Sequence, residues 1–251
     1  FEALLKRGGA GRAMADLDAE LLARLRDTAR RHGQSFETVA VEAVSPRPDG
    51  QAFTMNGRAV ALPLPGRFQA DNAALAASLA EAVGVADALS YLPRLTGVRG
   101  RLERALVLPN GAAAYVDYAH TPDAIARVLS ALRPHATGRL HIVFGAGGDR
   151  DPGKRPLMGA EAARGADVVI VTDDNPRGED PAAIRRAILA ACPQAQEIGD
   201  RHEAIGTALA GLREGDVLVV AGKGHEQGQI VKGEVIPFDD AAVIRALGEV
   251  A

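Results

Sequence analysis

Residues 139–177 read RLHIVFGAGGDRDPGKRPLMGAEAARGADVVIVTDDNPR, and their pattern decides the fold of the surrounding chain. An apolar run of strand length (139–144) enters a glycine-rich loop, a helical stretch (154–164) follows, and a second apolar run (167–172) enters a second polar loop. Two continuous apolar strands joined by a helix are typical of a parallel sheet covered on both faces. We therefore predict an α/β fold with a doubly wound, mostly parallel sheet.

The same alternation continues on both sides of this stretch. Further strands are expected at 104–108, 113–118 and 216–221, further helices at 122–133, 181–191, 201–212 and 239–248, and a terminal hairpin at 229–238. Pro122, Pro156 and Pro181 lie where the first turn of a helix tolerates proline.

The first part of the chain has a different order of predicted elements. An amphipathic helix is predicted at 17–29 and others at 71–83 and 86–93, whereas 36–44, 52–55 and 59–64 resemble short strands. Asn56-Gly57 between two of these strands indicates a two-residue hairpin. Since residues 96–101 look like a linker, we expect one domain at 1–95 and a second at 96–251.

Composition excludes several classes of protein. The 251 residues are 47% hydrophobic and 24% charged with a net charge of −3, so nucleic-acid and membrane-surface partners are not expected. Cys192 is the single cysteine and no apolar run has the length of a membrane span, which together favour a cytoplasmic protein. The first residues lack an initiator methionine and resemble the end of a helix over 1–6, so we interpret the chain as a fragment.

Three polar loops follow three of the predicted strands. They are Gly145–Pro156, Asp174–Arg177 and Gly222–Glu226. Because the carboxyl ends of parallel strands meet at one edge of a sheet, these loops are expected to form one site.

The charges in those loops indicate the chemistry of a ligand. Arg150 and Arg177 can each bind a carboxylate with a two-pronged guanidinium. Asp174 and Glu226 can hold ammonium groups. Groups of both signs suit a zwitterionic amino acid.

Four motifs in this order resemble the Mur ligases of peptidoglycan synthesis, especially the members that add diaminopimelate. They are Val116–Ala124 and the three loops above. Gly66–Asn72 is similar to a segment of the family's central domain, and Gly100–Glu103 to its hinge. Gln69 and Arg99 depart from the family pattern in these two segments.

The resemblance implies an ATP-dependent amide ligase with ATP and Mg²⁺ as cofactors. Such an enzyme joins meso-diaminopimelate to UDP-MurNAc-L-Ala-D-Glu. Residues 1–95 would be the remainder of an α/β central ATP-binding domain, and 96–251 a C-terminal domain with a Rossmann-like sheet. The family's P-loop, uridine-binding domain and carbamylated lysine have no counterpart here, and Lys6 falls just after the lysine segment. We therefore expect a monomer that binds small molecules but does not turn over alone, with no catalytic residue of its own.

The resemblance also implies two sets of binding residues. The diaminopimelate set is Arg150, Asp174, Asn175, Pro176, Arg177, Gly222 and Glu226. The ATP set is Asn72, Arg101, Asp117 and His120. Pro176 fixes its own φ and biases Asn175 toward an extended backbone, which would orient Arg177.

Several of these assignments have competing interpretations. Arg150 might form an ion pair with Asp149 or Asp151 instead, and Asp117 might be a helix cap or a buried hydrogen-bond acceptor. Lys154 and Arg155 could contact phosphate or backbone carbonyls. His225 is expected to be a hydrogen-bonded loop residue. His135, His141 and His202 lack metal-ligand spacing, so no metal site is predicted.

Three other functions remain open at this point. A folylpolyglutamate synthetase would have the same architecture but no Asp-Asn-Pro-Arg motif. A lysine-adding ligase would lack the arginine at position 177. A binding module without catalysis belongs to another class, and the Gly145 loop does not have the glycine order of a dinucleotide site.

Overall fold

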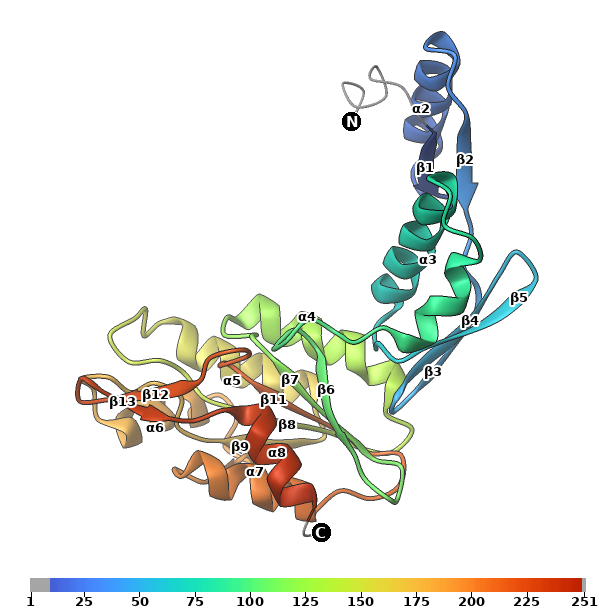
Figure 1. Cartoon of the computed structure of the whole chain (residues 1–251). Coiled ribbons are helices and arrows are strands. Elements are labelled where there is room, and N and C mark those ends of the chain that lie inside the picture. The colour runs from blue at the N-terminus through green and yellow to red at the C-terminus, as the bar shows by residue number, and fades with distance from the viewer. Residues whose placement is uncertain (1–9, 250–251) are drawn as a thin grey trace. The chain divides into compact units, whose positions relative to one another are not determined.

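The computed structural model describes residues 10–249, which form two compact units (Figure 1). The first unit holds the described residues up to Ser45 together with Gln51–Leu95. The second unit holds Pro46–Gly50 and the described chain from Thr96 onward. Each unit is described by itself below. The helix end expected at 1–6 and the position of Lys6 lie outside the described residues.

The second unit is built on one six-stranded sheet in the order β10-β9-β8-β11-β7-β6. Its strands are β6 (Glu103–Val107), β7 (Ala113–Asp117), β8 (Leu140–Phe144), β9 (Val168–Val171), β10 (Gln196–Glu197) and β11 (Val217–Ala221). Only β6 runs antiparallel to its neighbour, and the other pairings are parallel. The predicted α/β class with a mostly parallel sheet is confirmed.

Helices cover both faces of this sheet (Figure 1). The helices α4 (Pro122–Leu132), α5 (Lys154–Gly165) and α6 (Pro181–Leu189) pack side by side on one face, and α7 (Arg201–Ala210) and α8 (Asp240–Gly248) pack on the other. Pro122 and Pro181 are the first residues of their helices, as the sequence predicts. A hairpin of β12 (Gly228–Val231) and β13 (Glu234–Pro237) precedes α8.

The core explains why the central strands are almost entirely apolar. Every residue of β8 and of β11 is buried. Ile142 and Phe144 belong to the hydrophobic cluster under α4, α5 and α6, whereas Val143 belongs to the cluster under α7 and α8. Side chains alternate between the faces of a strand, so a strand covered on both sides takes a polar residue only where it has an internal partner, as His141 has in Asp216 at 3.2 Å. This packing fixes the strand ends from which the site loops emerge.

The described residues of the first unit form two small sheets and three helices. The strands β1 (Gly11–Met14) and β2 (Phe36–Val39) pair in parallel, and β3 (Glu42–Arg47), β4 (Gly50–Met55) and β5 (Arg58–Leu62) form a second sheet. The helices are α2 (Ala19–Arg31), α3 (Arg67–Ala82) and the 3₁₀ helix η1 (Ala88–Arg94). Asn56 and Gly57 both have positive φ, 51° and 74°, which confirms the predicted hairpin turn.

The structure differs from the predicted elements in three respects. The run 36–44 is two strands rather than one, because β2 ends at Val39, residues 40 and 41 belong to no strand, and β3 begins at Glu42 in a different sheet. The strands β1 and β10 were not predicted, since both are short and depend on a partner distant in sequence. The helix expected at 71–83 begins at Arg67, so Asn72 lies inside α3 rather than at its start.

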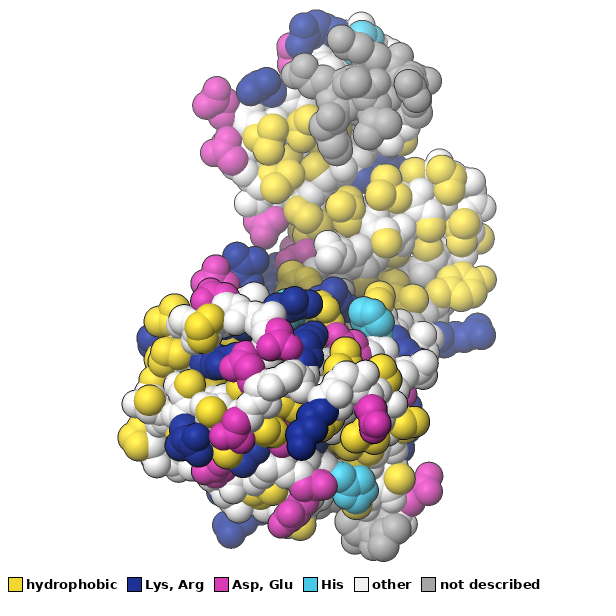
Figure 2. Space-filling view, turned by 90° about the vertical axis from the view of Figure 1, so that its left-hand side faces the viewer, with side chains coloured by type: hydrophobic (Ala, Val, Ile, Leu, Met, Phe, Trp, Pro, Cys, Tyr) yellow, Lys and Arg dark blue, Asp and Glu magenta, His cyan; other side chains and the backbone are white. Residues whose placement is uncertain are grey.

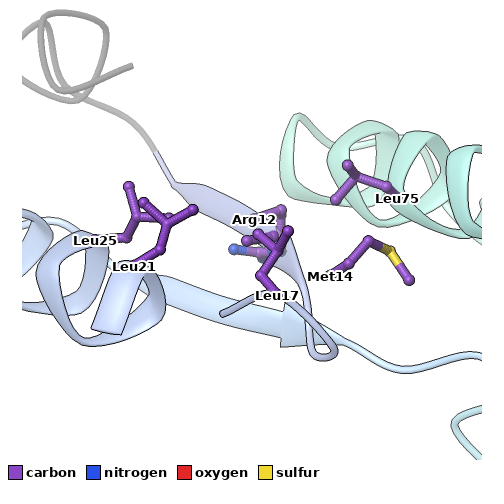
Figure 3. A pocket seen from close by; sticks show the side chains of 7 residues that line it. Arg12, Met14, Leu17, Leu21, Leu25 and Leu75 are labelled. Carbon is purple, nitrogen blue, oxygen red and sulfur yellow. The ribbon is translucent and has the colours of Figure 1, made fainter. Parts of the chain in front are cut away.

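An apolar cavity of about 340 Å³ lies in the first unit beside β1, α2 and α3 (Figure 3). Its lining consists of Arg12, Ala13, Met14, Leu17, Leu21, Leu25 and Leu75. The Arg12 guanidinium donates to Ser78 and pairs with Glu37. The remaining lining side chains are aliphatic or methionine, so this cavity offers packing surface rather than reactive groups.

Candidate functional site

A polar cavity of about 190 Å³ lies at the carboxyl edge of the large sheet. It is bordered by the loops that follow β7, β8, β9 and β11. The chain leaves β8 toward α5 on one face of the sheet and leaves β11 toward α8 on the opposite face. Open α/β sheets bind ligands at such a reversal.

The lining of this cavity overlaps strongly with the residues singled out in the sequence. It comprises Tyr118, His120, Gly147, Arg150, Lys154, Asp174, Asn175, Arg177, Gly222 and Glu226. The predicted diaminopimelate set is therefore brought together with the exception of Pro176, which is buried behind the lining. His120 of the ATP set borders the same cavity. Sequence reasoning did not identify Tyr118 and Gly147, and it left Lys154 undecided.

Arg177 is held by the backbone of two neighbouring segments. Its φ is 52°, its amide donates to the carbonyl of Ile230 at 2.9 Å, and its guanidinium Nη1 donates to the carbonyl of Gly148 at 2.9 Å. A Cβ atom at Gly148 would lie 1.9 Å from the carbonyl oxygen of Pro176, so only glycine allows this approach. The two loops after β8 and β9 are thus packed directly against each other.

Arg150 is exposed at the rim of the cavity. Its guanidinium has one long hydrogen bond, 3.4 Å to the carbonyl of Asp149, and forms no ion pair with the carboxylates in the described part of the chain. The competing ion pair with Asp149 or Asp151 is therefore not formed. Asp149 instead accepts from the amide of Gly178 at 3.1 Å.

Lys223 is the main residue that the sequence analysis missed. Its side chain is completely buried, and its Nζ lies 2.9 Å from Asn175 Oδ1, 3.4 Å from Asp174 Oδ1 and 3.7 Å from Glu226 Oε2. Burial lowers the pKa of Lys223, and the carboxylate of Asp174 opposes that change. In the sequence, Gly222-Lys-Gly-His was compared only with a P-loop. Such a comparison carries no information on whether the lysine is buried in an ion pair.

This lysine changes the expectation for the two acidic residues. Asp174 and Glu226 were expected to be available for the ammonium groups of a ligand. Each instead uses one oxygen on the ammonium of Lys223, because carboxylates at a buried site need an internal counter-charge. Asp174 Oδ2 and Glu226 Oε1 remain for a ligand.

A second buried cation lies beneath the same loops. The guanidinium of Arg201 donates twice to the carboxylate of Asp240, each time at 2.8 Å, and also to the carbonyls of Asp173 and Ala221. Burial acts to lower the pKa of Arg201, but the Asp240 carboxylate outweighs it and the pKa is raised. Arg201 therefore joins the ends of β9 and β11 to the first turn of α8.

The two basic residues at the start of α5 have different surroundings. Lys154 faces the cavity and its Nζ donates to the carbonyl of His120 at 3.0 Å. Burial lowers its pKa, while the carboxylates of Asp174 and Asp151 act in the opposite direction. Arg155 is buried and donates to Glu179 at 2.7 Å, so it supports the loops rather than the cavity.

Three residues of the predicted ATP set, Arg101, Asp117 and His120, belong to the second unit, and Asn72 belongs to the first. Asp117 is a half-buried acceptor, with Oδ2 bonded to the amide of Leu102 at 2.8 Å and Oδ1 to that of Ala119 at 2.9 Å. Burial raises the pKa of Asp117 against these two amides. The cap of α4 is Thr121, so the helix-cap interpretation of Asp117 is wrong.

The remaining members of that set lie around Tyr118 or in the other unit. The guanidinium of Arg101 lies 4.7 Å from the ring centre of Tyr118, which also contacts the rings of His120 and His225. His225 is exposed and its recorded contact is this ring. Asn72 is an exposed residue of α3 in the first unit.

The charge distribution around the cavity is mixed. Three cations, Arg150, Lys154 and Arg177, line it together with the carboxylates of Asp174 and Glu226. Figure 2, which views the molecule from the side of the β12–β13 hairpin, shows basic and acidic side chains interspersed on that face of the second unit. Such a lining suits a small ligand that carries both charges.

Residues 10–249 were also considered for a metal-binding cluster and for a membrane-spanning helix. No group of three or more His, Cys, Asp or Glu side chains is arranged to hold a metal ion within this range. Within the same range, no helix has the length and apolar character needed to cross a bilayer.

Comparisons with known proteins agree with the motif pattern. Residues 100–224 match the model of the Mur ligase, glutamate ligase domain. The UDP-N-acetylmuramoyl-L-alanyl-D-glutamate–2,6-diaminopimelate ligase of Caulobacter vibrioides is 54% identical over 243 residues, covering 92% of this chain and 50% of that protein. The protein of the same name from a Chelativorans species is 60% identical over 188 residues, covering 74% of this chain and 39% of its own.

Solved structures give the same result for the fold. A structure of a UDP-N-acetylmuramoyl-L-alanyl-D-glutamate–2,6-diaminopimelate ligase covers 99% of this chain and 55% of its own, with a TM-score of 0.83 and 33% identity. A folylpolyglutamate synthase from Mycobacterium tuberculosis has a TM-score of 0.55 at 24% identity and covers 92% of this chain and 53% of its own, which shows a shared fold only.

The chain spans about half the length of the curated relatives that it matches. Within that half, the order of the motifs, the topology of the sheet and the similarity to these relatives agree. The chain belongs to the Mur ligase family, and residues 100–224 are its C-terminal, glutamate ligase domain.

Proposed function

We propose that this chain is the part of an ATP-dependent amide ligase that binds meso-diaminopimelate for addition to UDP-MurNAc-L-Ala-D-Glu. One observation carries the proposal: Arg150 and Arg177 face the same cavity as the carboxylates of Asp174 and Glu226. The names of the relatives, which are 2,6-diaminopimelate ligases, support the choice of amino acid.

The geometry of the cavity assigns a task to each end of this ligand. The guanidinium groups of Arg177 and Arg150 bind the carboxylate of the distal end, and a two-pronged pair at Arg177 fixes its direction. Asp174 Oδ2 and Glu226 Oε1 accept from the ammonium group at that end. Gly222, whose φ is 116°, lets the backbone approach the ligand closely. Pro176 and Asn175 act by shaping the loop.

The other end of diaminopimelate carries the amine that reacts. In the proposed reaction, the γ-carboxylate of D-glutamate takes the γ-phosphoryl group of ATP to give an acyl phosphate, and ADP is released. This amine, in its neutral form, then attacks the acyl carbon; the amide bond forms as the bond to phosphate breaks, and inorganic phosphate and a proton are released. The chain contributes by orienting the amine and excluding water, which are large parts of catalysis in acyl transfer. Lys154, at the inner side of the cavity near His120, is placed to balance negative charge there.

We also propose nucleotide contacts for this chain. Asp117 would accept from the ribose hydroxyls, since each of its oxygens has a lone pair beyond its one backbone bond. Arg101 and His120 flank Tyr118 close by. Asn72 of the first unit is proposed as a nucleotide contact on the family resemblance alone. The described residues contain no P-loop and no group that fits Mg²⁺, so we assign no phosphate or metal ligand among them.

The wider assignments follow from the same proposal. Residues 1–95 would belong to the central ATP-binding domain and 96–251 to the C-terminal domain. The protein would be a cytoplasmic monomer acting on small molecules.

Calorimetric titration of the chain with three amino acids tests the proposal. We expect meso-diaminopimelate to bind about 100-fold more tightly than L-lysine or L-glutamate, because its second carboxylate forms charge-assisted hydrogen bonds that L-lysine lacks. Tighter binding of L-glutamate would favour the folylpolyglutamate-type function. Equal binding of L-lysine would favour a lysine-adding ligase, and no binding of any of the three would refute the proposed site.

A further inference from the structure

The floor of the polar cavity is organised around one buried ammonium group. Lys223 has no exposed side-chain surface and does not line the cavity, yet its Nζ contacts Asp174 and Asn175 from the loop after β9 and Glu226 from the loop after β11. It is thus the side chain shared by the two loops that supply the acidic groups of the site.

Burying the ammonium group of Lys223 costs desolvation free energy unless nearby counter-charges offset it. Replacing a whole buried ion pair by apolar side chains of similar volume is often neutral or stabilising, so stability alone gives little reason for a buried lysine and its carboxylates. The other charged groups that face Lys223 are Asp174, Glu226, Arg201 and Asp240. Arg201 is already satisfied by Asp240, so Lys223 is the counter-charge of the two cavity carboxylates.

Lys223 also determines which way the amide of Asn175 points. Asn175 Oδ1 accepts from Lys223 Nζ and from the amide of Ile230, both at 2.9 Å. Since both of these groups can only donate, the atom facing them must be the amide oxygen. Asn175 Nδ2 must then point the other way, where it donates to Glu226 Oε2 at 2.9 Å.

The chain of contacts therefore ends at the ligand-facing atoms. Asp174 Oδ1 and Glu226 Oε2 are held by Lys223 and Asn175, which leaves the second oxygen of each carboxylate for the cavity. Asp174 Oδ2 lies against Gly222, another lining residue, at 2.9 Å from where a Cβ would be. Without the ammonium, two neighbouring carboxylates would face each other with no charge between them.

We propose that Lys223 is a positioning residue of the amino-acid site. It holds Asp174, Asn175 and Glu226 in the one arrangement that presents a carboxylate oxygen from each loop to the ammonium group of the ligand, and it does so without touching the ligand. This role rests on the proposed function, because it assigns the cavity to an amino acid with both charges.

Substitutions of two lysines test this role in the whole chain. Lys223→Met removes the charge and keeps the length of the side chain. Lys223→Gln keeps a donor for Asn175 and is the milder change. Lys232→Met makes the same chemical change at an exposed turn residue and serves as the control. Each variant is titrated with meso-diaminopimelate by calorimetry, and its folding is followed by circular dichroism.

We expect both Lys223 variants to fold and to bind meso-diaminopimelate at least about 10-fold more weakly, whereas Lys232→Met binds like the unaltered chain. The same titration with pimelate, which has both carboxylates of meso-diaminopimelate but no ammonium group, should give equal affinities for the Lys223 variants and the unaltered chain, because pimelate does not use the carboxylates that Lys223 positions. A lysine that only stabilised the fold would affect the binding of both ligands alike.

The outcomes separate this role from the function on which it rests. If the unaltered chain does not bind meso-diaminopimelate, the proposed function fails and the role of Lys223 fails with it. If the unaltered chain binds and the Lys223 variants bind meso-diaminopimelate equally well, or lose affinity for pimelate to the same extent, the role alone is refuted. If neither variant folds, Lys223 is required for the fold itself, and its assignment to the ligand is refuted as well.

Discussion

The buried pair of Arg201 and Asp240 should control the stability of the second unit. Asp240→Asn removes the negative charge and leaves the guanidinium of Arg201 in place, although neither side chain of the pair has any exposed surface. One of the two hydrogen bonds of 2.8 Å that joined them would be lost, since the amide presents its NH₂ group to the guanidinium where the carboxylate presented a second acceptor.

The magnitude follows from the burial of the pair. Removing one partner of a buried ion pair costs about 3–5 kcal/mol, because the other charge is left without compensation. For a folding unit of this size, each kcal/mol lowers the melting temperature by about 2–4 °C. We therefore expect a fall of roughly 6–20 °C for Asp240→Asn. The double variant Arg201→Met with Asp240→Leu removes both charges and should recover at least half of the loss.

Circular dichroism during heating is the suitable assay, because the chain contains no tryptophan for fluorescence. Unfolding in urea at 25 °C gives the corresponding free energies. The reasoning would be refuted if Asp240→Asn melted within about 2 °C of the unaltered chain, or if the double variant were no more stable than the single one.

Three further predictions concern two substitutions and the activity of the unaltered chain. Gly148→Ala would place a Cβ 1.9 Å from the carbonyl oxygen of Pro176, so we expect a loss of about 1–3 kcal/mol in urea unfolding and weaker binding of meso-diaminopimelate; an unchanged variant would show that the two loops do not meet as described. Burial acts to raise the pKa of Asp216, but the backbone amides of Arg139 and Arg213 outweigh it and lower the pKa. A carboxyl with a lowered pKa stabilises the fold fully above its ordinary value of about 3.8 and loses this contribution as the pH falls through its value in the folded protein. The stability gap between the unaltered chain and Asp216→Asn, measured in urea, should therefore be wide at pH 7 and narrow at about pH 2–3, and a gap independent of pH would contradict this. The chain supplied with ATP, Mg²⁺, meso-diaminopimelate and the UDP-dipeptide should release no phosphate, and measurable turnover would overturn that expectation.

The large sheet could be predicted from sequence because its signals are local. The runs 139–144 and 167–172 are mostly apolar, and the prolines at 122 and 181 mark helix starts that the structure reproduces. The strands β1 and β10 have no such signal, since a four-residue or two-residue strand is defined only by its partner. The early start of α3 at Arg67 was missed because Gly66, with a φ of 89°, is not a side-chain cap.

The site divides in a similar way between predictable and hidden parts. The residues of the three loops could be identified from sequence because the carboxyl ends of parallel strands lie at the same edge of a sheet. Charged groups that follow such strands are therefore expected near one another. Lys223 was not, because burial and pairing of a lysine between two glycines depend on how the loops after β9 and β11 fold together. The same is true of the backbone contacts that hold Arg177, which come from Gly148 and Ile230.

One calorimetric measurement tests the central claim most directly, which is that Arg177 selects a ligand by its second carboxylate. The chain with Arg177→Ala is titrated with meso-diaminopimelate and with L-lysine. The account predicts that the affinity for meso-diaminopimelate falls about 100-fold, to the level of L-lysine, while the affinity for L-lysine stays as in the unaltered chain. An equal loss for both ligands, or an undiminished preference for meso-diaminopimelate, would contradict it.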